Sequence, residues 1–136
     1  MQEVIAHGVP ALMVGLEPPR IEVCLEYRPD DPYAVSMLVG APGALGGCPV
    51  GWVFARQLLV DGVTASAGLG NVRVRPYDPE QTAVELRVGG DLTVLLVRTS
   101  AVRRFLAATY QAVAPGAEWR RIGWEEVLAR LTEDRP

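Results

Sequence analysis

The chain has no lysine, a single histidine and only two cysteines among its 136 residues. Cys24 and Cys48 do not form a C-x-x-C pair, and together with His7 they provide too few ligands for a zinc or iron site. No serine lies in a G-x-S-x-G context that could use His7 as a general base. We therefore expect reduced thiols, no metal, no cofactor and no catalytic residues, with His7 on an edge strand.

Long hydrophobic runs are also missing. The apolar stretch 9–16 is interrupted by Gly and Pro and is far shorter than the ~20 residues that cross a membrane. No segment near the N-terminus has the pattern of a secretory signal. Nearly half of the chain (49%) is apolar, which is enough to build a core for one domain. We expect a single domain over residues 1–136, cytoplasmic and without a membrane span.

Two glycine-rich stretches invite a nucleotide-binding interpretation, which their sequences do not support. Gly40–Gly47 is not followed by Lys-Ser or Lys-Thr, so it does not make a phosphate-binding loop. After Gly68 and Gly70, Arg73 stands where a dinucleotide-binding motif has its third glycine. We expect both stretches to be loops without a bound nucleotide.

Alternating apolar and charged residues predict strands. Ile21, Val23, Leu25 and Tyr27 alternate with polar residues across 20–28, and a similar alternation follows at 33–39 and 72–75. Gly89-Gly90-Asp91 separates two further strands, 82–88 and 92–98, and favours a hairpin turn. Residues 2–16 could supply one or two more strands.

The period then changes to that of a helix. Residues 102, 105, 106, 109 and 113 form one apolar face, with Ser100 placed to cap the start and Pro115-Gly116 to end the helix. Residues 124–131 repeat the spacing in a shorter final helix, and 56–60 could make one helical turn that Gly62 ends. Helices that follow a run of strands predict an α+β fold with antiparallel sheets of about seven to eight strands.

Four residues are candidates for binding a partner. Trp52 and Phe54 share one face of a short strand, where core packing is the first expectation. If they are partly exposed, they become interface anchors, because aromatic and arginine residues dominate interaction hot spots. Arg73 and Arg75 share a strand face, and the arginines at 87 and 98 could lie near them. Arginines on a sheet face can also hold single-stranded nucleic acid, although the net charge of −3 argues against it.

Three blocks of sequence, in this order and spacing, resemble the SsgA-like family. They are Asp31-Pro32-Tyr33-Ala34-Val35, then Trp52-Val53-Phe54-Ala55-Arg56-x-Leu58-Leu59-x-x-Gly62, and then Gly68-x-Gly70-Asn71-Val72-Arg73-Val74-x-Pro76. The family commonly has Asp where this chain has Asn71, and the loop 40–51 is particular to this chain.

The resemblance implies a fold related to the Whirly-type single-strand-binding proteins, with two antiparallel sheets held by C-terminal helices and assembled as a trimer. It also implies a non-enzymatic regulator of sporulation-linked cell division in actinobacteria, located in the cytoplasm at the septum. Its partners would be division proteins such as the tubulin-like GTPase FtsZ and SsgA, and an SsgB-like member, which recruits FtsZ, is favoured. Single-stranded nucleic-acid binding on the sheet face stays open as the alternative function.

Overall fold

The computed structural model describes residues 4–40 and 50–121 of the chain. Within these ranges seven strands form one antiparallel sheet, in the order β4-β3-β2-β1-β7-β6-β5. The strands are β1 (Ile5–Met13), β2 (Arg20–Tyr27), β3 (Ala34–Gly40), β4 (Val50–Ala55), β5 (Val72–Pro76), β6 (Gln81–Val88) and β7 (Asp91–Arg98). The predicted α+β class and strand number are confirmed. The sheet is continuous, whereas the family resemblance implied two sheets, and the relation to the Whirly-type fold stays a prediction.

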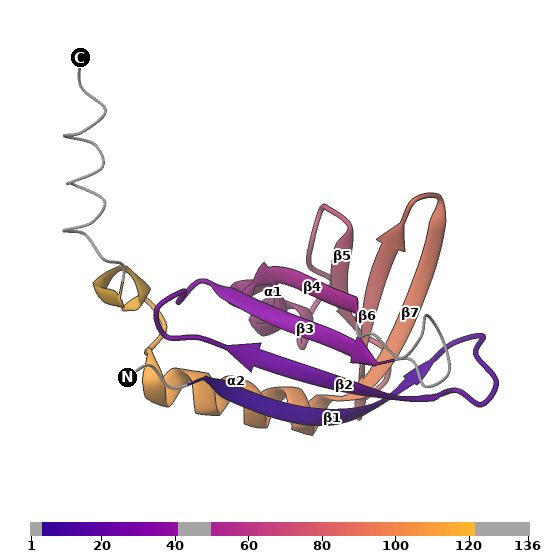
Figure 1. The fold of residues 1–136 in the computed structure, drawn as a ribbon, viewed down its shortest axis with the longest axis horizontal. Helices are drawn as coiled ribbons and strands as arrows, with labels where there is room; N and C mark the ends of the chain where they lie inside the picture. The colour runs from indigo at the N-terminus through magenta and orange to yellow at the C-terminus, as the bar shows by residue number, and fades with distance from the viewer. Residues whose placement is uncertain (1–3, 41–49, 122–136) are drawn as a thin grey trace, which may run out of the picture.

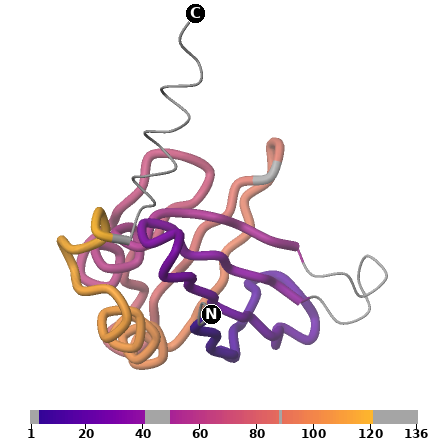
Figure 2. The backbone as a smooth tube through the Cα atoms, turned by 60° about the vertical axis from the view of Figure 1, so that its left-hand side comes forward, coloured from indigo at the N-terminus to yellow at the C-terminus, as the bar shows by residue number. Residues whose placement is uncertain are grey.

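The sheet bends so strongly that it approaches a barrel. Figure 1 shows β1 to β4 side by side, with β5 to β7 running across them, and Figure 2 shows the β6–β7 hairpin projecting from the rest. The outermost strands, β4 and β5, are brought together by α1 (Arg56–Gly62), which follows β4 directly and packs on β5. Ala67 adds a short backbone bridge to Val74 of β5, with N–O distances of 2.8 and 3.0 Å. The bend thus creates one enclosed inner face.

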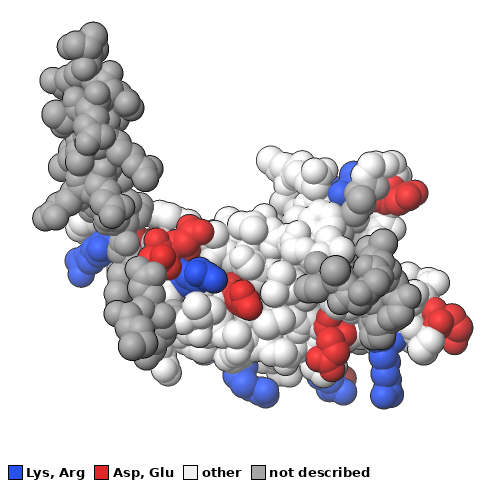
Figure 3. Space-filling view, viewed as in Figure 1, with Lys and Arg blue, Asp and Glu red and all other residues white. Residues whose placement is uncertain are grey.

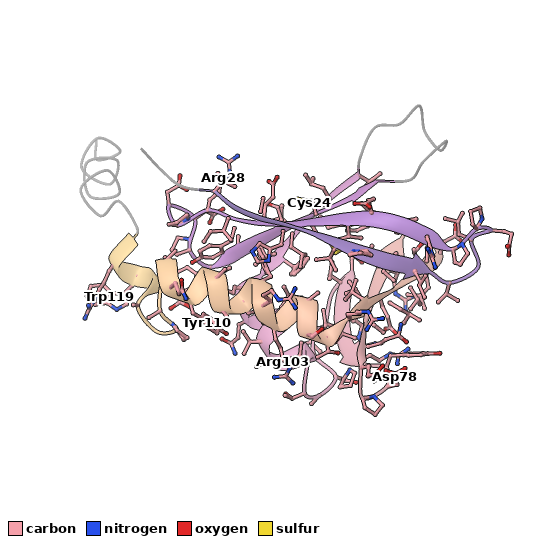
Figure 4. All side chains as sticks on the ribbon, turned by 90° about the horizontal axis from the view of Figure 1, so that it is seen from below. Cys24, Arg28, Asp78, Arg103, Tyr110 and Trp119 are labelled. Atoms are coloured by element: carbon pink, nitrogen blue, oxygen red, sulfur yellow. The ribbon has the colours of Figure 1, made fainter. Side chains whose placement is uncertain are left out.

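The inner face is filled by α2 (Thr99–Ala112), which lies beneath β1 in Figure 1. Its predicted apolar face is confirmed, since Val102, Phe105, Leu106, Thr109 and Val113 are all 5% exposed or less. The alternation in β2 is confirmed as well, because its residues at 21, 23, 25 and 27 all face this core. Figure 4 shows α2 on one side of the sheet, while Cys24 and Arg28 lie on the other. Polar residues of the strands therefore face outward.

Three local predictions are wrong. The helix begins at Thr99, so Ser100 lies inside its first turn and is not the N-cap; Arg98 occupies that position without a side-chain cap bond. Tyr33 precedes β3 and is 51% exposed, although the alternation had grouped it with the inward-facing residues. β1 is not an edge strand, because it pairs with β2 and, at residues 11–13, with β7, although the stretch that contains His7 pairs with β2 alone. The predicted final helix 124–131 lies outside the described residues.

Gly62, at the last position of α1, is required for the closure of the sheet. A Cβ atom there would overlap the Cγ1 and Cβ atoms of Val74 and lie 3.1 Å from its carbonyl carbon. Val74 is fully buried in the centre of β5, so it has no room to move away. Gly62 ends the helix, as predicted. It also permits the close approach of α1 to β5.

We expect Gly62→Ala to lower the free energy of unfolding by about 1–3 kcal/mol, the usual effect of an extra methyl group in a packed core. The effect opposes the gain of up to about 1 kcal/mol that alanine brings to a helix interior. Urea unfolding followed by circular dichroism measures it. Gly70→Ala is the matched control, because a Cβ at Gly70 has nothing within 4 Å. Equal stability of the two variants would contradict the close packing of α1 on β5.

Candidate functional site

Arg56 is a charged side chain held inside the fold, only 2% exposed. The alternation of β4 turns Phe54 inward, and Arg56, two positions further on, continues in the same direction at the first residue of α1. Its Nη1 donates to the carbonyl oxygen of Val113 at 2.8 Å and lies 3.4 Å from both the carbonyl oxygen and Oγ1 of Thr109. Carbonyls at the C-terminal end of a helix carry partial negative charge, which favours a cation there.

Two aromatic rings and one carboxylate complete the surroundings of Arg56. The guanidinium carbon lies 5.0 Å from the ring centroid of Tyr27 and 5.1 Å from that of Tyr110, within the range of cation–π attraction. Its Nη2 lies 3.0 Å from Oε2 of Glu118, and the two groups form an ion pair. Glu118 begins the short 3₁₀ helix η2 (Glu118–Arg121). Arg56 thereby joins β2, α1, α2 and η2.

The pKa of the Glu118 carboxyl group lies below its usual value. The largest cause is the hydrogen bond from its own backbone N–H, followed by desolvation in the opposite direction and then by the hydrogen bond from Arg56. The carboxylate is therefore ionised at neutral pH and balances the buried guanidinium. The groups that surround Arg56 in the described part of the chain belong to the protein itself, so the cluster stabilises the fold.

The predicted aromatic pair faces the core. Phe54 lies opposite Val35 and is 8% exposed, whereas Trp52 lies opposite Met37 and is only partly buried. Between them Val53 points outward and is 69% exposed. Of the two aromatic residues, Trp52 is the one with surface available to a partner.

The predicted arginine pair lies on the outer face of β5. Arg73 is exposed and stands opposite Glu85 of β6, while Nε of Arg75 donates to Oε2 of Glu85 at 2.8 Å. A hollow of about 240 Å³ lies beside these three side chains. The Arg75 side chain is 37% exposed, and such surface ion pairs contribute little to stability. Both arginines are therefore accessible to a partner.

The outer face of β3 and β4 is different, because few charged side chains are visible there (Figure 3). Val53 of β4 is 69% exposed on this face, and Leu38 of β3 lies near it. An apolar surface at a strand that is paired on one side only is open to contact with another protein. The outer face thus has an uncharged part over β3–β4 and an arginine-rich part over β5–β7.

The surroundings of Cys24 and His7 indicate structural roles for both residues. Burial, and then the nearby charge of Glu26, raise the pKa of the Cys24 thiol, which lowers its reactivity. The His7 ring stands edge-on to Phe105 with centroids 5.5 Å apart. Within residues 4–40 and 50–121, no three His, Cys, Asp or Glu side chains come together to hold a metal ion. No helix in the described part of the chain is long and apolar enough to cross a membrane.

Arg56 is the residue that sequence reasoning missed, although it lies in one of the quoted blocks. Its signal was present, since it keeps the inward parity of Trp52 and Phe54. A second signal was Thr109, a polar residue in the middle of the apolar face of a helix. Sequence separation hid the connection, because Arg56 and Thr109 are 53 residues apart.

Comparison with known proteins gives consistent matches. The sequence pattern of the family described as "Streptomyces sporulation and cell division protein, SsgA" matches residues 21–118. The sporulation-specific cell division protein SsgB of Saccharopolyspora erythraea is 37% identical, with 95% of this chain and 86% of that protein covered. SsgB of Salinispora tropica is 38% identical, with 85% and 82% covered.

A solved structure has the same fold. It is that of SsgB from Streptomyces coelicolor, reported with mutations that correlate to longitudinal cell division during sporulation. The two structures superpose with a TM-score of 0.79 at 30% identity, covering 90% of this chain and 98% of the other.

We expect Arg56→Met to lower the free energy of unfolding by about 3–5 kcal/mol, because it leaves Glu118 and buried carbonyls without their cation. Arg56→Lys should recover only part of this loss, since a single ammonium group cannot bind the same set of groups. Arg103→Met is the matched control, because Arg103 is exposed on α2. Denaturant unfolding measures all three variants. A loss below about 1 kcal/mol for Arg56→Met would contradict the central role of the cluster.

The lowered pKa of Glu118 also predicts a pH dependence of stability. A carboxyl group whose pKa falls on folding stabilises the protein above its unfolded pKa of about 4.3, and this contribution disappears as the pH falls through the folded pKa. We therefore expect the wild type to exceed Glu118→Gln in stability at pH 7, with the difference shrinking in acid. Unfolding midpoints measured from pH 7 to pH 3 test this. A difference that stays constant would show that the ionised carboxylate has no part in it.

Proposed function

The chain belongs to the SsgA family of Streptomyces sporulation and cell division proteins, and from that membership we propose that it acts in sporulation-specific cell division as a non-enzymatic scaffold. The observation that carries the proposal is 37–38% identity to SsgB proteins over at least 85% of the chain. Those relatives are named for a role in sporulation-specific division. A scaffold acts by contact with other proteins, so its active part is a surface.

The finer proposal is that the chain is SsgB-like and recruits FtsZ with the help of SsgA. It would do so from the cytoplasm at the septum, as a homotrimer. The distribution of side chains supports a role in protein interaction. Within the described residues the inner face is packed with apolar side chains and the Arg56 cluster, whereas Val53 and the arginines of β5 lie outside. The exposed apolar and arginine residues are the types that dominate protein interfaces.

One observation favours a second candidate, single-stranded nucleic-acid binding. Arg73 and Arg75 of β5, Arg87 of β6 and Arg98 of β7 all lie on one side of the sheet, the arrangement predicted for phosphate contacts. The sequence as a whole has a net charge of −3, which weakens attraction to a polyanion at long range. Protein interaction therefore remains the first proposal.

Co-sedimentation tests both candidates. We expect the purified protein to sediment with FtsZ that GTP has polymerised. With GDP-bound FtsZ, which does not polymerise, the protein should stay in solution; this control measures how much protein sediments without polymers. A labelled oligonucleotide should not shift on addition of the protein. Absence from the FtsZ pellet, together with oligonucleotide binding that weakens steeply with salt, would reverse the order of the two proposals. Sedimentation of the protein alone gives its oligomeric state.

A further inference from the structure

A continuous row of side chains crosses five strands on the outer face of the sheet. Arg20 of β2 stands opposite Leu12 of β1, which stands opposite Leu96 of β7. The row goes on through Ala83 of β6 to Arg75 of β5. Neighbouring strands are about 4.8 Å apart, so the Cα atoms of the two arginines at its ends are separated by roughly 19 Å along the row. We call this row, from Arg20 to Arg75, the cross-strand row.

The part of the row nearest β2 is hollow. A cavity of about 550 Å³ opens there, where β1 and β2 meet β6 and β7. Its main lining residues are Pro10, Leu12, Arg20, Glu22, Leu96 and Arg98. Leu96 points outward yet is only 9% exposed, because it lies at the bottom of this hollow, and Ala83 beside it is fully buried. The floor is therefore apolar and aliphatic, and guanidinium groups stand at its rim.

The charge of this face is opposite to that of the chain. The outward positions of β5, β6 and β7 and the adjoining ends of β1 and β2 carry five arginines and two glutamates, which leaves an excess of three positive charges, against −3 for the sequence. The arginines are Arg20, Arg73, Arg75, Arg87 and Arg98. Arg75 is paired with Glu85, and the other four form no ion pair with a residue of the described ranges. Free guanidinium groups at a concave surface attract carboxylates or phosphates.

The side chains at the bottom of the hollow favour carboxylates of a peptide over phosphates of a nucleic acid. Single-stranded nucleic acid needs aromatic side chains on which its bases stack, and none of the described residues of the cross-strand row is aromatic. Leu12 and Leu96 instead offer an aliphatic surface of the kind that accepts an aliphatic side chain. The combination suits carboxylates that flank apolar residues.

From this geometry we infer that the cross-strand row and its hollow bind an extended acidic peptide segment of a partner protein. An aliphatic side chain of the peptide enters the hollow over Leu96, beside Arg98, and carboxylates on its two sides reach Arg20 at one end of the row and Arg75 at the other. The distance of roughly 19 Å corresponds to about six extended residues. This inference rests on the proposed function, because it names the surface and the partner chemistry through which a scaffold would bind.

The test uses the full chain and a fluorescein-labelled peptide with aliphatic residues flanked on both sides by aspartates. We expect saturable binding by fluorescence anisotropy, and loss of binding when asparagine replaces each aspartate. Arg20→Glu with Arg98→Glu should weaken binding at least about tenfold, because attraction becomes repulsion. Arg103→Glu with Arg104→Glu on the exposed side of α2 makes the same change of charge and should leave binding within about twofold.

Several results would overturn the inference. They are no binding of the acidic peptide, an equal loss in the two double variants, or tighter binding of an oligothymidine than of the peptide, which would assign the face to nucleic acid. Thermal melting of both double variants verifies that they are folded. If Arg20→Glu with Arg98→Glu still sediments fully with FtsZ, the row is not the scaffold's binding surface, whereas the proposed function stands. If the wild type binds the peptide but not FtsZ, the proposed function fails and the peptide site remains.

Discussion

A buried guanidinium, that of Arg56, is the interaction on which the other parts of this structure depend. A cation inside a protein is tolerated only where hydrogen bonds and opposite charge replace its hydration. Arg56 meets that requirement with carbonyls at the end of α2, the rings of Tyr27 and Tyr110 and the carboxylate of Glu118. These groups come from β2, α2 and η2, and Arg56 itself from α1, so four elements must come together at once. The cluster therefore fixes α2 and η2 against the bent sheet.

Because the Arg56 cluster holds α2 on the inner face of the sheet, the two faces have different roles. The inner face of the sheet is occupied by α2, the apolar core and the Arg56 cluster, which leaves the outer face for partners. That face has an uncharged part over β3 and β4 and an arginine-rich part over β5 to β7 (Figure 3 shows the first). Membership of the SsgA family supplies the context of sporulation-specific division. The proposed scaffold role requires a surface that binds a partner, and the proposed acidic-peptide site is one such surface on the outer face.

Much of the local structure was predictable because side-chain direction follows from the chain's own periodicity. The alternation in β2 and the helical spacing in α2 were both confirmed, and so was the hairpin at Gly89 and Gly90. Prediction failed at the ends of elements and at positions in the sheet. Ser100 looked like a cap because its residue type favours one, and His7 looked peripheral because it is near the N-terminus. Neither the first residue of a helix nor the neighbours of a strand is determined by such local preferences.

The sequence by itself determined which residues of β2 and α2 face inward, that strands precede the main helix, and that metal ligands are scarce. It also placed Trp52, Phe54, Arg73 and Arg75 on strands, and its three blocks pointed to the family. Only the tertiary structure decided that β1 pairs with β7, which sets Arg20, Leu12 and Leu96 in one row, and that Arg56 reaches Thr109 and Val113. The physical reason is range: periodicity is a property of neighbouring residues, whereas strand order and the satisfaction of a buried charge depend on residues far apart in the chain.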